Sequence, residues 1–253
     1  MRLFSLPTLQ IRTPGYSEQR RALVIGAPAA LACILSSQSA LVAAMDATSS
    51  DIALQRFLDE SLDRALQLKS DASAGGQDEY VTFLESAVTT IRNVSAEPLS
   101  QTSWKGFDPG VFLGNSGRNR AFFIVQWRLA PGAFLPPHCH PRTSVCTLGL
   151  EGSSTLRHFE VPADAPSYRD DRSTEFLVRE TRQLDLTSGT TSTLTEHRDN
   201  VHLFEAGPDG ARGIDVTTDY GGDGSFSFLE FDHRRPEIPA ERAYRARWVG
   251  TNI

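Results

Sequence analysis

The chain has 253 residues and a net charge of −6, with 25 basic and 31 acidic side chains. No basic patch is evident in this acidic balance, so nucleic acid is excluded as an expected partner. A chain of this length holds one or two domains. Only Cys139 and Cys146 lie beyond the N-terminal region, and two cysteines do not make a disulfide framework.

The N-terminal region, residues 1–44, has the order of a secretory signal. An arginine-containing stretch, Met1 to Arg21, precedes the apolar residues Ala22 to Leu35, and Val42-Ala43-Ala44 supplies the small residues of a cleavage site. Residues 19–24, Gln-Arg-Arg-Ala-Leu-Val, also resemble the twin-arginine export signal. The apolar stretch is too short for a convincing membrane span. We expect export, to a bacterial periplasm, with no stable membrane insertion after cleavage; the alternatives are an uncleaved anchor and an organellar transit peptide.

Residues 51–94 form a helical preface according to the spacing of their apolar side chains. Apolar residues recur at three- and four-residue intervals in two stretches, the first starting at Ile52 and the second at Tyr80. The segment Asp71 to Gln77, which is rich in Ser, Ala and Gly, separates them. We therefore predict two helices.

Residues 100–233 have the character of a single β domain. Short apolar runs alternate with Gly, Pro, Asp and Ser at intervals that suit a sandwich or barrel. The expected strands are 121–129, 146–150, 156–161, 176–178, 191–194, 201–206, 212–217 and 225–231. The tail, residues 234–253, is expected to be irregular. The predicted fold is mainly β: one antiparallel barrel preceded by two α-helices.

A His-x-His pair begins the most informative pattern of the chain. His138 and His140 end the run Pro-Gly-Ala-Phe-Leu-Pro-Pro-His-Cys-His, which starts at Pro131. Side chains two residues apart on a strand point to the same face, so both histidines can aim into a barrel. Five residues separate Gly132 from His138, and eleven separate His140 from Gly152. This spacing resembles the first motif of the cupins, whose fold is a double-stranded β-helix or jelly-roll barrel.

A third histidine would complete a metal site, and two candidates exist. His197 lies in Thr-Glu-His-Arg-Asp, which is typical of a solvated turn, whereas His202 alternates with Val201 and Leu203 as a buried strand residue does. We favour His202. Imidazole nitrogens suit iron, copper, nickel and zinc, and three of them leave positions open for substrate. His158 and His233 lie outside any pattern and are expected to be structural.

The chain resembles the thiol dioxygenases, which are iron cupins that include cysteine dioxygenase, cysteamine dioxygenase and the plant cysteine oxidases. It is most similar to the last two. The resemblance rests on His138-x-His140-Pro141, Gly152, Asn200-Val201-His202-x-Phe204-x-Ala206, Asp215-Val216 and Tyr220. It implies a mononuclear Fe(II) held by His138, His140 and His202, which adds both atoms of O₂ to the sulfur of a small or peptide thiol and gives a sulfinate. It also implies Tyr220 as a catalytic residue that reaches the pocket.

Several positions depart from the family pattern. The glutamate that follows the second histidine in common cupins, and the crosslinking cysteine of this family, both correspond to Val145. Cys146 is one position away and should face the other side, as should Cys139, so no crosslink is expected. No arginine stands at the carboxylate clamp of cysteine dioxygenase, and Arg118, Arg120 and Arg128 are expected to be solvated. These departures favour a thiol without a carboxylate beside its amine, or a peptide thiol.

Two other readings of the same site remain open. One is a different metal cupin enzyme, such as a ring-type dioxygenase or an isomerase. The other is a non-catalytic cupin that holds a metal or a small ligand.

Overall fold

A computed structural model describes residues 55–91, 103–118, 121–167, 172–221 and 227–250. The predicted signal, residues 1–44, lies outside these ranges, as do the start of the helical preface and the last three residues of the chain. No helix among the described residues is long and apolar enough to cross a membrane.

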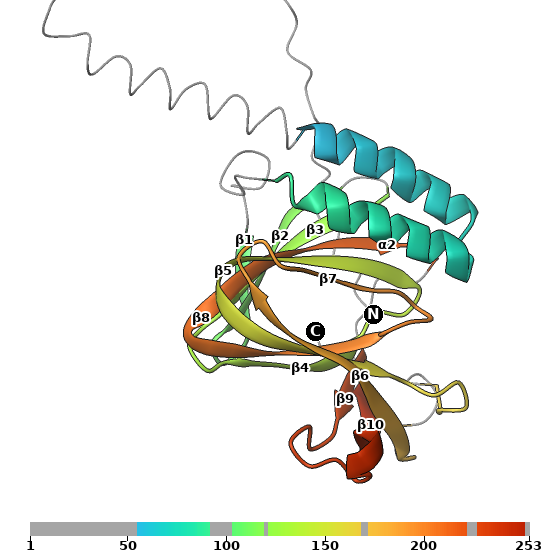
Figure 1. Ribbon diagram of the computed structural model, residues 1–253, viewed down its shortest axis with the longest axis vertical. Helices are drawn as coiled ribbons and strands as arrows, with labels where there is room; N and C mark the ends of the chain where they lie inside the picture. The colour runs from blue at the N-terminus through green and yellow to red at the C-terminus, as the bar shows by residue number, and fades with distance from the viewer. Residues whose placement is uncertain (1–54, 92–102, 119–120, 168–171, 222–226, 251–253) are drawn as a thin grey trace, which may run out of the picture. The chain divides into compact units, whose positions relative to one another are not determined.

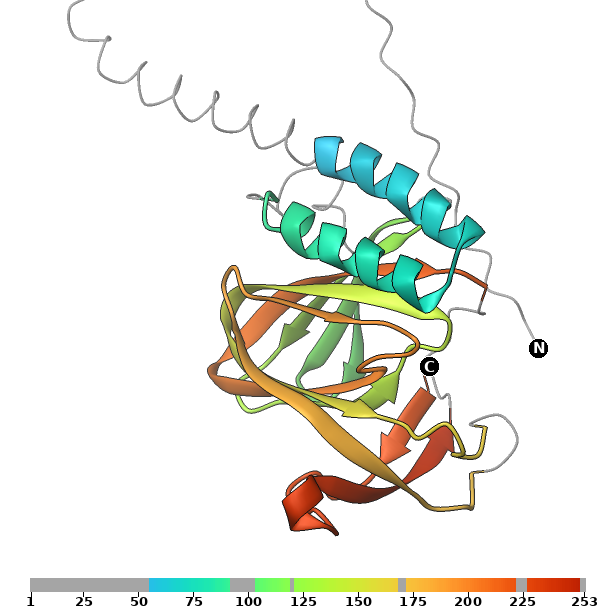
Figure 2. The same cartoon turned by 45° about the vertical axis from the view of Figure 1, so that its right-hand side comes forward.

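The predicted helical preface consists of two helices where the structure describes it. Residues 55–70 are helical, and α2 follows at Ala74–Val88. Ser73 begins α2 because its hydroxyl oxygen accepts a hydrogen bond from the backbone N–H of Gly76 at 3.2 Å, which satisfies one of the free donors of the first turn. The two helices lie side by side against one face of the barrel (Figures 1 and 2).

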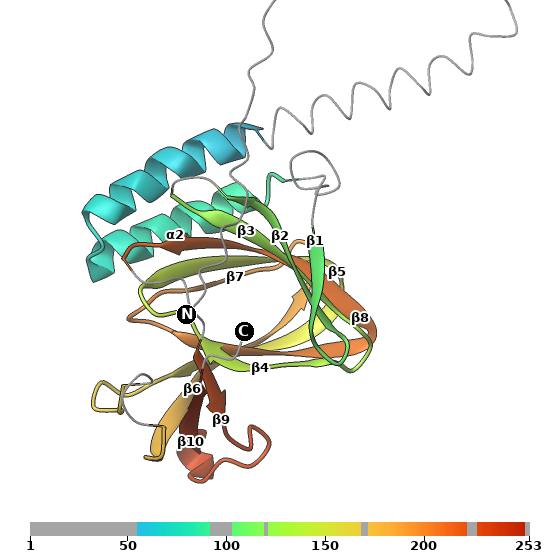
Figure 3. The same cartoon turned by 180° about the vertical axis from the view of Figure 1, so that it is seen from behind.

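The β domain comprises ten strands within the described residues, joined in one curved sheet with the order β1-β2-β3-β8-β4-β9-β10-β6-β5-β7. The strands are β1 (Ser103–Asp108), β2 (Val111–Arg118), β3 (Phe123–Leu129), β4 (Phe134–Cys139), β5 (Thr143–Glu160), β6 (Phe176–Thr187), β7 (Thr191–Leu194), β8 (Val201–Asp219), β9 (Ser227–Glu230) and β10 (Ala243–Gly250). An additional β8–β5 ladder closes the sheet on itself. The predicted mainly β, cupin-like barrel preceded by helices is therefore confirmed (Figure 3).

Two long strands replace four of the predicted short ones. β5 joins the segments expected at 146–150 and 156–161, and β8 joins those expected at 201–206 and 212–217. The two strands pair with each other along most of their length, with register shifts at Gly149/Glu151 and Gly152/Ser154. These bulges let one strand bend through both halves of the barrel without ending. Gly149 and Gly152 therefore mark bends within one strand, and not a turn between two strands.

The C-terminal tail is not irregular, contrary to the sequence prediction. A 3₁₀ turn at Pro239–Glu241 leads into β10, which pairs with β6 on one side and β9 on the other. Tyr244, Ala246 and Trp248 point from β10 into a buried cluster. The period-two alternation of Tyr244-Arg-Ala-Arg-Trp248 carried this signal in a segment otherwise rich in charge.

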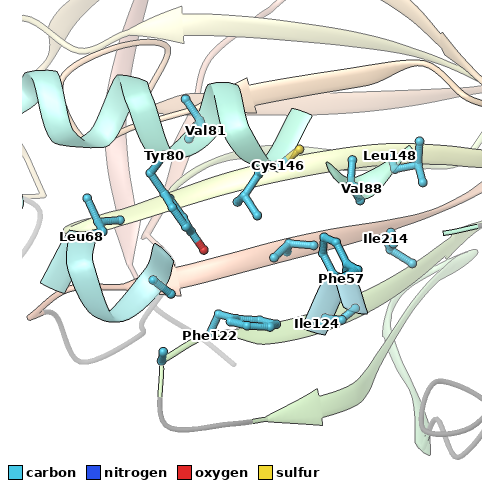
Figure 4. Packing of buried hydrophobic residues seen from close by; sticks show 14 of the residues in the cluster. Phe57, Leu68, Tyr80, Val81, Val88, Phe122, Ile124, Cys146, Leu148 and Ile214 are labelled. Atoms are coloured by element: carbon cyan, nitrogen blue, oxygen red, sulfur yellow. The ribbon is translucent and has the colours of Figure 1, made fainter. Parts of the chain in front are cut away.

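Three buried clusters fill the spaces around the barrel wall. The helix-facing cluster joins Phe57, Tyr80 and Val88 to Cys146 and Ile214 (Figure 4). The interior cluster lies within the barrel and includes Trp127, Leu129, Leu135, Leu156 and Phe204. The outer cluster, under β9 and β10, includes Cys139, Phe159, Leu203 and Trp248. Cys139 and Cys146 thus face away from the interior, as predicted, and both are buried.

Candidate metal centre

Three histidines converge inside the barrel. The Nε2 atom of His202 lies 3.0 Å from the Nε2 of His138 and 3.0 Å from the Nε2 of His140. Among the described residues these three form the single cluster with ligand atoms close enough to hold one metal ion. A separation near 3 Å is what ligands at about 2.0–2.2 Å from a common metal require. The structure therefore brings together the three predicted ligands.

The sequence around His138 explains its orientation. Pro136 and Pro137 cannot donate to a β ladder, and the β4–β8 register shifts between Leu135 and His138. The freed carbonyl oxygen of Pro136 accepts a hydrogen bond from Nδ1–H of His138 at 2.8 Å. This bond fixes the tautomer whose Nε2 lone pair points at the other two histidines, as an outer partner does for a metal ligand.

The electrostatics of the three rings fit a bound cation. Burial lowers the pKa of His138 to about 4 and holds the pKa values of His140 and His202 well below the ordinary value, so all three are neutral near pH 7. Neutral imidazoles cannot satisfy both of these contacts by hydrogen bonds among themselves. Each hydrogen bond needs a proton on one Nε2 and a lone pair on the other, and the Nε2 of His202 takes part in both contacts. One cation between them would accept all three lone pairs. The donor set therefore fits a bound metal ion.

The motif glycines and Val145 have distinct structural reasons. Gly132 has φ +68° and Gly152 has φ +67°, a left-handed conformation that side chains disfavour. A Cβ on Gly152 would also lie 2.1 Å from the carbonyl oxygen of Gly210 on β8. Val145 is buried and shares its strand face with Thr147. An apolar side chain thus occupies the position at which common cupins place a fourth, anionic ligand.

His197 lies where the sequence predicts it, whereas His158 lies closer to the cluster than any motif indicates. His197 lies in the β7–β8 turn, with Nε2 3.3 Å from the Asp78 carboxylate on α2, away from the cluster as predicted. His158 is nearly fully buried on β5, and β-pairing sets it opposite His202, with ring centroids 5.9 Å apart. Its Nε2 hydrogen-bonds to Ser192 Oγ at 2.7 Å. His158 thus packs beside a ligand, although no sequence motif marks it, because register between β5 and β8 cannot be read from spacing.

Tyr220 does not meet the three histidines. It belongs to the helix-facing cluster, and its hydroxyl donates to Gln77 Oε1 on α2 at 2.8 Å. Burial raises its pKa above the ordinary value. The structure therefore places this residue where it fastens α2 to the end of β8, and a catalytic role for Tyr220 remains a prediction that these contacts do not support. Of the three arginines considered, the side chain of Arg128 is described, and it is exposed on β3.

A buried carboxylate shares the barrel interior with the cluster. Asp215 on β8 accepts hydrogen bonds at Oδ1 from Thr147 Oγ1 at 2.7 Å and from Trp127 Nε1 at 3.2 Å. Trp127 packs on Phe204, which packs on His202, with centroid separations of 5.1 and 4.9 Å. Burial raises the pKa of Asp215 to about 6. Among these contacts Asp215 has two neutral donors and no cationic partner.

Comparison with known proteins finds only distant structural similarities. No family model and no curated protein matches the sequence. KdgF from Halomonas sp. is similar at 16% identity and TM-score 0.36, over 47% of this chain and 89% of that chain. A structure of oxalate oxidase is similar at 15% identity and TM-score 0.38, over 53% and 62%. A cupin superfamily protein from Desulfitobacterium hafniense DCB-2 is similar at 13% identity and TM-score 0.31, over 46% and 83%. These likenesses concern the fold and assign no activity.

Proposed function

We propose that this protein is a mononuclear non-haem Fe(II) dioxygenase that oxidises a thiol to a sulfinate with O₂. The observation that carries the proposal is the neutral set of His138, His140 and His202 together with an apolar residue, Val145, at the fourth-ligand position. Fe(II) bound to three neutral ligands would keep its full charge and open positions, at which a thiolate and O₂ can be brought together.

The chain's own residues contribute orientation and exclusion of water. Pro136 holds His138 in the ligating tautomer through the 2.8 Å hydrogen bond to Nδ1. Leu135, Leu156 and Phe204 line the interior with apolar surface beside the cluster. In such surroundings charged groups interact more strongly than they do in water. A thiol in these apolar surroundings is therefore expected to lose its proton only where the positive charge of the metal ion compensates the thiolate.

The buried carboxylate of Asp215 favours an amine-bearing thiol as substrate. Its Oδ1 already accepts two hydrogen bonds, and a ligand ammonium group that reached it would stabilise the ionised carboxylate, which burial disfavours. The sequence has no arginine at the position of the carboxylate clamp of cysteine dioxygenase, which disfavours substrates whose carboxylate needs a partner. Cysteamine or a peptide with an N-terminal cysteine is the preferred class, ahead of free cysteine and 3-mercaptopropionate.

We expect thiol-dependent oxygen uptake by the Fe(II)-loaded protein. Anaerobically purified and iron-loaded protein should consume O₂ with cysteamine or an N-terminal cysteine peptide, and sulfinate should form in an amount equal to the O₂ consumed, because both oxygen atoms end on sulfur. An oxygen electrode and mass spectrometry of the product measure the two quantities. Absence of uptake with all four thiols would replace the proposal with another metal cupin enzyme or a binding protein.

Val145→Glu tests the ligand set behind this activity. A carboxylate at this buried position would bind the iron and occupy a place that a reactant needs, so thiol oxidation should fall by at least about tenfold while iron is retained. Val145→Gln is the matched control, since it has nearly the same size without the charge. Equal loss of thiol oxidation in the two variants would mean that altered packing, and not a fourth anionic ligand, causes the effect.

We also propose that the protein is exported through the twin-arginine route. The support is Arg20-Arg21 ahead of the apolar stretch and the Val42-Ala43-Ala44 site. Residues 1–50 fused to a reporter that tolerates this route alone should carry it out of the cytoplasm. Replacement of Arg20 and Arg21 by lysine should stop export. Unchanged passage of the double variant would indicate a general secretory signal.

A further inference from the structure

The metal centre is almost sealed from solvent, and its most exposed ligand is His138. The exposed fraction is 6% for His138, 4% for His140 and 0% for His202. One route from solvent to the cluster therefore passes His138. The residues that cover His138 lie on this route.

Phe228 on β9 lies directly against His138. The β4–β9 ladder pairs His138 with Phe228, so their side chains occupy the same face of the sheet. Their ring centroids are 5.6 Å apart. Its neighbours Ser227 and Leu229 are buried on the other face, whereas Phe228 keeps part of its surface exposed. Phe228 thus stands between the ligand and solvent.

Phe107 on β1 contacts the ring of Phe228. The β1–β2 register pairs Gly106 with Phe112 and Asp108 with Val111, which leaves Phe107 without a cross-strand partner at a β-bulge. A bulge re-aims the side chain of the extra residue. Here the ring of Phe107 stacks on Phe228, with centroids 5.5 Å apart and an interplanar angle of 26°. It also packs against the interior cluster.

The contact between these two strands is made by side chains. β1 pairs with β2, and β9 pairs with β4 and β10; within the described ranges no backbone ladder joins β1 to β9. Two stacked rings can separate by rotation of their side chains, without loss of a backbone hydrogen bond. Rotamer changes of partly exposed side chains are fast compared with strand opening. Opening of this junction therefore breaks a ring-stacking contact and no strand pairing.

We propose that Phe107 and Phe228 form an aromatic gate through which ligands reach the metal centre, and that the gate admits neutral and cationic thiols faster than anionic ones. The identity of the ligand as a thiol rests on the proposed function. The faces of aromatic rings attract cations and offer no donor to a carboxylate, which would lose hydration as it passed. Cysteamine should therefore enter faster than 2-mercaptoethanol, and 2-mercaptoethanol faster than 3-mercaptopropionate.

The test measures entry rates with cobalt, whose absorption bands report the ligand set. Stopped-flow traces give the rate at which metal-free protein takes up Co(II), and the rate at which each thiol perturbs the Co(II) bands. Phe228→Ala and Phe107→Ala should raise both rates by roughly fivefold or more and reduce the difference between the three thiols, as expected when access limits a step. The Co(II) spectrum before thiol addition should not change, because the three histidines remain.

Phe112→Ala is the matched control, since Phe112 is 41% exposed on the neighbouring strand β2. Its rates should equal those of the wild type, and Phe228→Leu provides a milder variant if Phe228→Ala does not fold. Gate variants whose rates stay within about twofold of the wild type, or a Phe112→Ala variant that is equally fast, would overturn the proposal. If no thiol perturbs the cobalt in any variant, the thiol assignment fails, and the Co(II) uptake rates still decide whether the gate exists.

Discussion

His202→Ala is expected to abolish metal retention. His202 is the central ligand, because its Nε2 lies 3.0 Å from both other Nε2 atoms. The variant leaves two neutral imidazoles on one strand end, with a cavity in place of the third, and two ligands do not hold a divalent ion against dialysis. Metal analysis of the purified variant after chelator dialysis measures the effect. Without metal, any thiol oxidation by this site should also be lost.

The matched control is His197→Ala. His197 lies five residues earlier in the chain, and its ring contacts Asp78 and Gln77 on α2 instead of the cluster. This variant should retain metal like the wild type. The contact with Asp78 is partly exposed, so the loss of stability should be about 1 kcal/mol or less. Metal lost from His197→Ala but kept in His202→Ala would reverse the ligand assignment and contradict the geometry.

The ligands could be predicted from sequence because their positions depend on local rules. His138 and His140 share a face by the period of a strand, and His202 was preferred to His197 because its neighbours alternate like a buried strand. The motif glycines also follow local rules, since Gly132 and Gly152 both adopt positive φ. Such features require no knowledge of which strands become neighbours.

The surroundings of the metal could not be predicted because they depend on long-range pairing. His158 lies beside His202 through the register of β5 with β8. Phe107 and Phe228 meet although more than a hundred residues separate them. Tyr220 was expected in the pocket from the resemblance to a known family. Its side chain instead points toward α2, where its hydroxyl donates to Gln77. Sequence thus identified the three histidines that converge, and tertiary structure decides which residues surround them.

The buried carboxylate of Glu180 on β6 joins β10, the strand that was not predicted from the sequence, to the barrel. Its side chain is fully buried and pairs with Arg157 on β5 and Arg242 before β10. It also accepts a hydrogen bond from the Tyr244 hydroxyl on β10 at 3.1 Å. Three segments distant in sequence therefore share one negative charge.

Glu180→Ala is expected to destabilise the fold by about 3–5 kcal/mol, because Arg157, at 9% side-chain exposure, would keep a buried charge without its partner. Urea unfolding measures the change. Glu241→Ala is the matched control: its pair with Arg179 is exposed, at 51% and 62%, and should contribute about 0–1 kcal/mol. Similar losses of stability in both variants would mean that burial does not strengthen the ion pairs of Glu180.

Glu180→Ala should also weaken metal retention, because Arg157 immediately precedes His158, which packs on His202. Glu241→Ala should not affect metal retention.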